Sequence, residues 1–132
     1  MAATAFGTVL KRLREAKGLS LRDVSKLSGV DHAYVYRLET GEKEAPSDDA
    51  LTQIFRALKP TKRQESILRF ISGRDVALDL LDPSIIDEEQ IALEDFESAA
   101  QMSFRGKKPS SPVEWRKVID KIRAMREDIE SG

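Results

Sequence analysis

Between residues 5 and 73, apolar residues return every three or four positions in five short stretches, each bounded by residues that start or stop a helix. In the first stretch, one face carries Phe6, Val9, Leu10, Leu13 and Ala16, and Gly18 ends it. The other four stretches begin after Ser20, Asp31, Ser47 and Thr61 and end at Gly29, Gly41, Lys59 and Gly73. No alternation typical of strands occurs. The sequence therefore predicts an all-α fold with five short helices in residues 1–73.

Several function classes are excluded by composition. The chain of 132 residues contains no cysteine and a single histidine, His32. Disulfides, cysteine-ligated metals, thiol catalysis and multi-histidine metal sites are therefore ruled out. No apolar run approaches the roughly 18–20 residues that span a bilayer, and no secretory signal is visible. We expect a cytoplasmic protein without membrane attachment, cofactor, metal or catalytic activity.

The charge distribution divides the chain into three regions. Residues 1–74 carry 14 basic and 9 acidic side chains, a net charge of +5. Residues 75–103 carry nine acidic side chains and no basic one, and residues 104–132 carry eight basic and five acidic ones. A basic first region can approach a polyanion, which an acidic region would repel. The acidic run is interpreted as a solvated helix face, with a DNA-mimicking surface as the alternative.

Residues 74–132 are predicted to form a second, helical domain. An apolar cluster around Leu78 ends at Asp82-Pro83, and the acidic residues 87–90 are suited to open a further helix. Residues 104–110 are basic and contain Gly106 and Pro109, so an exposed loop is expected there. Ser111 and Glu114 have the spacing of a capping box that starts the last helix.

The last helix carries an apolar stripe longer than a small domain needs for its own core. Its residues are Trp115, Val118, Ile119, Ile122, Met125 and Ile129. Leaving such a stripe in water is unfavourable, because burial of each side chain is worth about 1.5–3 kcal/mol. The stripe is therefore expected to pack on residues 75–103, on another subunit, or on both. We predict that it forms the contact of a homodimer.

The spacing in residues 19–41 predicts two short helices joined by a tight turn at Gly29, a helix-turn-helix. Leu21, Val24 and Leu27 are expected to face inward in the first of these helices. The run Leu38-Glu39-Thr40-Gly41, with the pattern before it, resembles the lambda/434 repressor-like (XRE) helix-turn-helix family over roughly residues 5–71. The resemblance implies a five-helix head that reads double-stranded DNA. Glu39 is expected to tie down the loop after its helix.

Carried over by position, the resemblance assigns DNA reading to the start of the second motif helix, at His32, Ala33, Tyr36 and Arg37. It assigns phosphate contacts to Ser20 and Arg22. An arginine can bind guanine in a bidentate way, and an alanine can contact a thymine methyl group. The chain departs from the family at Leu21, where glutamine is common, and at Tyr36, where a small residue is common.

A second resemblance lies around residue 104. The run Phe104-Arg105-Gly106-Lys107-Lys108-Pro109, with Trp115 eleven residues after Phe104, is similar to the C-terminal segment of DdrO-type repressors. In that group, and in ImmR- and CapH-type repressors, a zinc metalloprotease of the IrrE/ImmA/CapP kind cuts the repressor. The resemblance implies a cut between Phe104 and Arg105, although Phe104 stands where leucine is usual. A basic exposed loop without a regulatory role is the alternative.

These observations together predict a dimeric transcriptional repressor that binds a palindromic operator and is inactivated by a partner metalloprotease. Stress, DNA-damage or phage-defence control would fit such a protein. Two alternatives remain open. The chain could be the antitoxin of a toxin–antitoxin pair, whose tail covers a toxin, or a protein-interaction module whose acidic region binds a basic partner.

Overall fold

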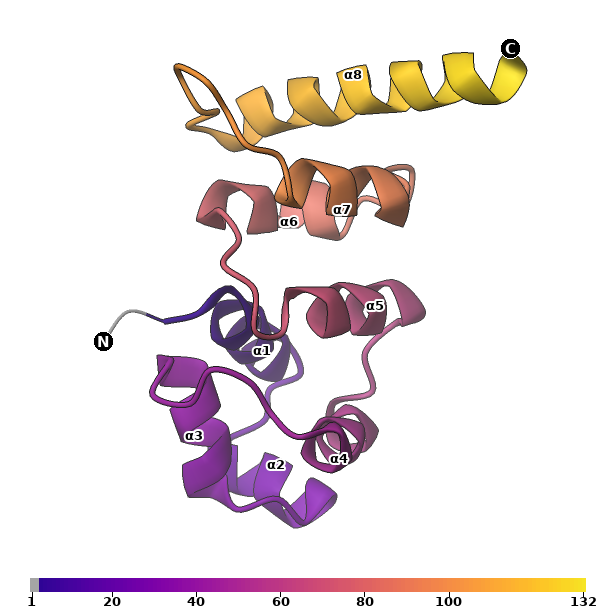
Figure 1. The fold of residues 1–132 in the computed structure, drawn as a ribbon. Coiled ribbons are helices and arrows are strands. Elements are labelled where there is room, and N and C mark those ends of the chain that lie inside the picture. The colour runs from indigo at the N-terminus through magenta and orange to yellow at the C-terminus, as the bar shows by residue number, and fades with distance from the viewer. Residues whose placement is uncertain (1–2) are drawn as a thin grey trace. The chain divides into compact units, whose positions relative to one another are not determined.

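The computed structural model describes residues 3–132, which form helices and connecting turns without strands (Figure 1). The prediction of an all-α fold is confirmed. The chain separates into two compact units, one up to Asp75 and the other from Val76 to Gly132. The first unit consists of five helices, α1 Ala5–Ala16, α2 Leu21–Ser28, α3 His32–Thr40, α4 Asp48–Leu58 and α5 Lys62–Ile71.

Each helix of the first unit starts at a residue whose side chain accepts a backbone hydrogen bond. These N-cap residues are Thr4, Ser20, Asp31, Ser47 and Thr61. Such caps satisfy N–H groups that have no partner inside the helix. After α2 and α3 the chain turns through glycines in the left-handed conformation, Gly29 at φ 77° and Gly41 at φ 84°. The predicted helix boundaries of this unit therefore agree with the structure within about two residues.

The core of the first unit is built from the inner faces of all five helices. Phe6, Leu10, Leu38, Ile54 and Leu68 are completely buried. Helix α1 packs against α3 and α5, and α2 packs against α3 and α4. Helices α2 and α3 therefore pack against each other across the turn that joins them, and α4 and α1 support them from either side.

Helices α1 and α3 approach each other at Gly7. A Cβ atom added to this glycine would lie 2.2 Å from the carbonyl oxygen of Leu38. No side chain fits in that space, so the backbones are in direct contact and the spacing of the two helices is set by main-chain atoms.

Two residues of this unit that were predicted to face inward are exposed. Ala16, at the end of α1, is exposed, and Leu27 is 61% exposed, although it was expected to face inward with Leu21 and Val24. Val24 is completely buried, while Ser28 takes the inward position at the end of α2. The eight-residue helix has room for only a narrow buried face, because the turn at Gly29 follows at once.

The second unit is formed by four elements, the 3₁₀ helix η1 Leu78–Leu81, α6 Pro83–Ile86, α7 Leu93–Ala100 and α8 Pro112–Ser131. Its core contains Leu80, Leu81, Ile85, Phe96 and Trp115. Helix α8 packs against η1, α6 and α7, and it extends beyond the end of the much shorter α7 (Figure 1).

The predicted helix opening at residues 87–90 is wrong. Helix α7 begins at Leu93, and residues 87–92 form turns. The carboxylate of Glu88 accepts a hydrogen bond from the backbone N–H of Gln90 at 3.2 Å, and the Glu88 carbonyl accepts one from Ile91 at 3.0 Å. Short acidic side chains that bond to nearby N–H groups favour turns over helix interiors. Leu78, expected in the apolar cluster, is 62% exposed.

The start of α8 differs from a simple capping box. The hydroxyl of Ser111 accepts a hydrogen bond from the backbone N–H of Glu114 at 3.2 Å, as expected. The Glu114 carboxylate, however, accepts from the N–H of Ser110 at 2.7 Å, one residue before the cap. This hydrogen bond, together with the nearby charges of Lys107 and Lys117, holds the pKa of the Glu114 carboxyl below its usual range. The loop end is thereby fixed to the first turn of α8.

Candidate nucleic-acid interface

The pair α2–α3 forms a helix-turn-helix whose second helix is firmly anchored. The turn is closed by the hydroxyl of Ser28, which accepts a hydrogen bond from the N–H of Val30 at 3.0 Å. The inner face of α3 is buried through Val35, Leu38 and Glu39. A helix held in this way presents its outer face as a rigid surface.

The outer face of α3 brings together the residues that the sequence predicted to read DNA. His32, Tyr36 and Arg37 are exposed, and Ala33 is half-buried beside them. Tyr36 is 53% exposed, unusually high for a large aromatic residue that has a core close by. Within residues 3–132 the guanidinium of Arg37 has no ion pair, so its donors remain available. Exposed side chains one turn apart on a helix can reach neighbouring base edges in a major groove.

At the start of α2, Ser20 and Arg22 are both exposed. The hydroxyl of Ser20 accepts from the N–H of Asp23 at 3.0 Å, and the Ser20 N–H donates to the Asp23 carboxylate at 2.8 Å. The bond from the Ser20 N–H to the carboxylate, followed by the interaction with the Ser20 side chain, lowers the pKa of the Asp23 carboxyl, which is charged at neutral pH. Ser20 therefore serves as a cap and keeps only its hydroxyl proton for a phosphate, whereas the Arg22 side chain is free within the described chain.

An acidic residue also stands at the start of α3. The Asp31 carboxylate accepts from the N–H of Ala33 at 3.2 Å and lies 3.3 Å from Nδ1 of His32. The negative charge at this helix end disfavours a phosphate there. The start of α3 is consequently suited to contact base edges rather than the DNA backbone.

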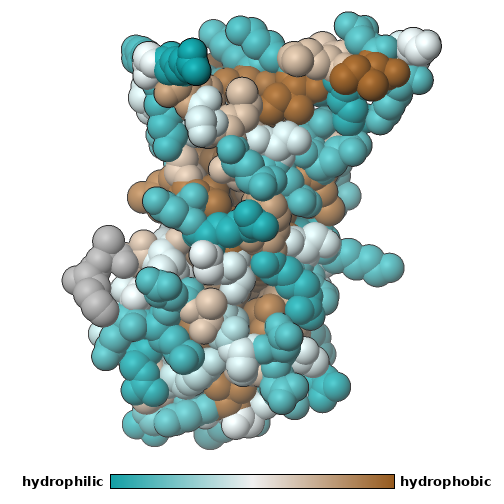
Figure 2. Space-filling model, in the orientation of Figure 1, coloured by the Kyte–Doolittle hydropathy of each residue, from teal (hydrophilic) through white to brown (hydrophobic). Residues whose placement is uncertain are grey.

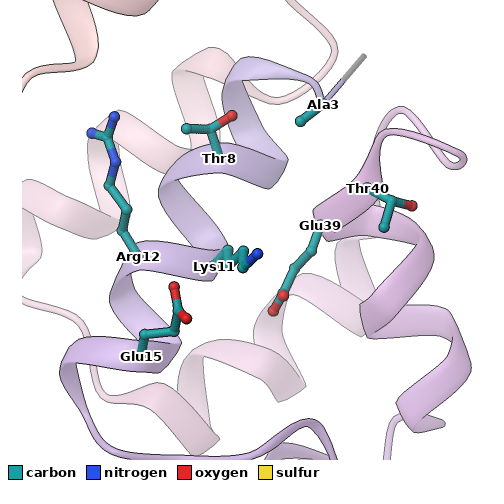
Figure 3. Close-up of a pocket in the computed structure, with 7 residues that line it drawn as sticks. All are labelled: Ala3, Thr8, Lys11, Arg12, Glu15, Glu39 and Thr40. Carbon is teal, nitrogen blue, oxygen red and sulfur yellow. The ribbon is translucent and has the colours of Figure 1, made fainter. Parts of the chain in front are cut away.

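A buried ion pair joins α3 to α1. Two nitrogens of Arg14 donate to the Glu39 carboxylate at 2.7 and 3.0 Å, and a third donates to the carbonyl of Leu19 at 2.8 Å. The hydrogen bonds that Arg14 donates to the Glu39 carboxylate raise the pKa of Arg14. Figure 3 shows Glu39 reaching from α3 toward α1, beside a hollow of about 480 Å³. The prediction that Glu39 ties down the loop after α3 is wrong, because Glu39 pairs with Arg14 on α1.

The loop after α3 contains residues that the sequence did not single out. The hydroxyl of Tyr34 accepts a hydrogen bond from the N–H of Ser47 at 3.2 Å. The ammonium of Lys43 lies 5.2 Å from the centre of the Tyr34 ring. The backbone N–H of Lys43 donates to the carbonyl of Arg37 at 3.0 Å. Lys43 is therefore held close to the end of α3. No periodicity links residues across a loop, so the only available sequence signal was a basic residue directly after the motif.

In the second unit, the predicted cleavage site lies in the non-helical segment between α7 and α8. Arg105 is exposed, whereas Phe104 is half-buried and packs edge-on against Trp115, with ring centres 5.6 Å apart. Gly106 has φ 91°, and the chain bends at Arg105 and Gly106. One side chain of the predicted cleavage site is thus anchored and the other is free.

The apolar stripe of α8 is divided between core and surface. Trp115 and Ile119 are each 2% exposed and belong to the core of the unit. Val118 and Ile122 are half-buried, while Met125 is 65% and Ile129 is 79% exposed. Figure 2 shows apolar surface along α8. Packing within the unit therefore covers only the first part of the stripe.

In the described chain, no helix is both long and apolar enough to cross a membrane. No group of three or more histidine or acidic residues suited to a metal ion occurs in residues 3–132.

A family model described as a helix-turn-helix domain matches residues 5–64. Among curated proteins, no match to the chain is found. The matched range covers α1 to α4 and the start of α5, and it therefore includes the α2–α3 motif with its exposed outer face. The first unit therefore contains an N-terminal helix-turn-helix domain, which supports a DNA-binding role for the chain.

Proposed function

We propose that the chain is a sequence-specific transcriptional repressor that binds a palindromic operator as a dimer. The observation that carries this proposal is the outer face of α3, where His32, Tyr36 and the unpaired Arg37 are exposed on a helix fixed by its buried inner face. A net charge of +5 over residues 1–74 favours approach to DNA.

Each residue of the interface has an assigned role. Arg37 donates to the acceptors of a guanine, and His32 and Tyr36 contact neighbouring base edges. Ala33 offers an apolar contact to a thymine methyl group. Phosphates are contacted by Ser20, Arg22 and Lys43.

The assignment is tested by replacing Arg37 with alanine. We expect operator binding to weaken by about 1–3 kcal/mol with discrimination lost at one base position, because the arginine's donors face the groove and not the core. Fluorescence anisotropy with operator variants measures both effects. Arg56→Ala, which removes an exposed arginine from α4, is the matched control and should change affinity little. Unchanged affinity in a folded Arg37→Ala chain would contradict this reading face.

The second unit supplies the dimer contact in this proposal. Repressors of this kind read two half-sites about one helical turn apart, which requires two linked heads. The exposed part of the α8 stripe, with Met125 and Ile129, supports self-association, since a monomer leaves these side chains in water. Sedimentation analysis of the chain tests this step, and a monomer at micromolar concentration contradicts it.

Cleavage between Phe104 and Arg105 by a zinc metalloprotease of the IrrE/ImmA/CapP kind is proposed to end repression. The non-helical segment around these residues supports the proposal, because proteases bind extended chain. The cut would separate α8 covalently from the head. Incubation with such a protease followed by mass measurement of the fragments is the test. An intact chain, or a cut within residues 1–75, contradicts it.

A further inference from the structure

Four apolar residues on α8 have the spacing of a helix–helix seam. Val118, Ile122, Met125 and Ile129 follow one another at intervals of four, three and four residues, which places them in a narrow row along the helix. Trp115, three residues before Val118, begins the same row and is buried in the core of the second unit, as is Ile119 beside the row. The row is progressively uncovered toward the end of α8, where Ile129 is 79% exposed.

Two opposite charges flank this row on the same side. Lys121 and Asp128 are exposed and seven residues apart, so both lie on the side of the row away from the core residues. Neither has an ion pair within residues 3–132, and a separation of about 10 Å along the helix is too long for a contact between them. By contrast, Arg123 pairs with Glu127 at 2.9 Å, and Arg126 pairs with the buried Asp95 at 2.8 Å.

The two halves of α8 also differ in charge. Residues 112–123 carry four basic and two acidic side chains, and residues 124–132 carry one basic and three acidic ones. The last turn contains no basic residue. Acidic side chains at a helix C-terminus are unfavourable in isolation, because they meet the negative end of the helix dipole. A basic partner at this end would remove the conflict.

We propose that α8 pairs with α8 of a second copy in an antiparallel arrangement, about a two-fold axis between Arg123 and Ala124. The inference rests on the dimer of the proposed function and specifies its contact. Ile122 then lies opposite the partner's Met125, and Val118 lies opposite the partner's Ile129. The register brings Lys121 beside the partner's Asp128, and symmetry makes this pair occur twice.

The charges select this orientation over a parallel one. A parallel pair in register would place Lys121 beside the partner's Arg126 and would bring the like-charged ends of α8 together. In the antiparallel pair, the basic half of each helix faces the acidic half of its partner. A shallow pocket of about 290 Å³ beside the basic half is lined by four lysines, Lys107, Lys108, Lys117 and Lys121, and by one acid, Glu114. Its net positive charge favours the partner's acidic helix end.

The proposal is tested by reversing the two flanking charges in the full chain. Lys121→Asp places two acids at each pair, and Asp128→Lys places two lysines there. We expect each variant to form homodimers roughly tenfold more weakly than the parent chain, since two attractive pairs become repulsive. The double variant Lys121→Asp/Asp128→Lys should regain the parent dimerisation constant. Sedimentation equilibrium measures the constants, and circular dichroism verifies that each chain is folded.

Mixing the two single variants gives the sharpest result. In the mixture, every acid at position 121 or 128 of one chain meets a lysine of the other, so heterodimers should exceed both homodimers. Native mass spectrometry can count them, because the variants differ in mass. Arg123→Asp with its neighbouring Glu127→Lys is the matched control and leaves dimerisation unchanged, since this pair lies within one chain.

A second measurement uses the absence of cysteine from the chain. Ile122→Cys and Met125→Cys chains should form disulfides with each other several times faster than with themselves, because positions 122 and 125 are opposite only in the antiparallel register. Faster self-crosslinking of each variant overturns the orientation. If the parent chain is a dimer and the charge reversals leave its dimerisation constant unchanged, the proposed orientation is wrong, although the dimer itself stands. A monomeric parent overturns the dimer itself.

Discussion

The two units differ in how completely they cover their apolar residues. Among residues 3–75, Leu27 and Tyr36 are the only large apolar side chains with strong exposure, and Tyr36 lies on the face that we assign to DNA. In the smaller second unit, five such side chains are exposed, Leu78, Met102, Val113, Met125 and Ile129. The first unit is therefore complete as a folded module, whereas the second leaves surface that a partner can cover.

Each unit also contains one buried carboxylate paired with an arginine, and the pairs differ in their surroundings. Glu39 and Arg14 are both largely buried and connect α3 to α1. Asp95 is 1% exposed, but its partner Arg126 lies partly at the surface, where it also contacts Glu94 and Glu130. The pair of the first unit fixes α3 on α1, and the pair of the second holds the outer half of α8 on α7.

Removal of residues 112–132 should give the largest effect, because it disrupts the second unit and leaves the first unit folded. The truncated chain loses Trp115 and Ile119 from the second core, while the first unit keeps all five helices. We expect a folded monomeric head whose affinity for a palindromic operator is lower by about 10²–10⁴-fold, because two linked heads bind as one unit. Gel-shift titration measures the loss. Removal of residues 131–132 alone is the control and should change nothing.

Glu39→Ala should destabilise the first unit by about 3–5 kcal/mol, because it leaves the Arg14 guanidinium without its buried partner. Urea denaturation followed by NMR signals of each unit would show the loss in residues 1–75 and little change elsewhere. Glu42→Ala, at an exposed position one turn later, should stay within about 0.5 kcal/mol of the parent. If the two substitutions lower the free energy of unfolding equally, the ion pair does not stabilise the first unit.

One exposed apolar residue in each unit allows a direct test of whether the exposed surface of that unit lies in the dimer contact. Met125 and Leu27 are similarly exposed, at 65% and 61%. Met125→Asp should weaken dimerisation roughly 10–100-fold, because it places an unpaired charge in the contact. Leu27→Asp should leave the oligomeric state unchanged. Sedimentation velocity compares them, and equal behaviour would remove the distinction between the two surfaces.

The smallest effect concerns the carboxylates at two helix starts, Asp23 in the first unit and Glu114 in the second. Backbone N–H groups lower the pKa of both carboxyls, so each favours the folded state at neutral pH and ceases to do so as the pH falls through its folded pKa. NMR titration should show both protonating at lower pH in the folded chain than in the urea-unfolded chain. Glu114→Gln should then alter thermal stability at pH 7 but not at pH 2.

The sequence predicted the first unit well because its information is local. Caps such as Ser20 and Thr61 and the left-handed Gly29 and Gly41 act within a few residues, so spacing alone places the helices. The outer face of α3 follows from the same periodicity. What could not be predicted depends on contacts between distant residues. Glu39 finds Arg14 twenty-five positions away, and Lys43 reaches Tyr34 across a loop.

The second unit was less predictable because its elements are short. Residues 87–92 carry acids suited to a helix start, yet side-chain hydrogen bonds such as that of Glu88 hold them in turns. The apolar stripe of α8 was visible in the sequence, but its division into core and surface was not. Trp115 is buried because α8 begins beside the core, and Ile129 is exposed because α7 ends after eight residues.

The direct contact of the α1 and α3 backbones at Gly7 sets the orientation of α3 through atoms other than the side chains of its outer face. The carbonyl of Leu38 and the glycine determine how α3 is presented, and neither atom belongs to the outer face. Substitutions at His32, Tyr36 and Arg37, whose side chains are exposed, are therefore expected to leave the position of the helix unchanged. Under the function that we propose, these positions would change the operator preference while the Gly7 contact keeps the orientation of α3.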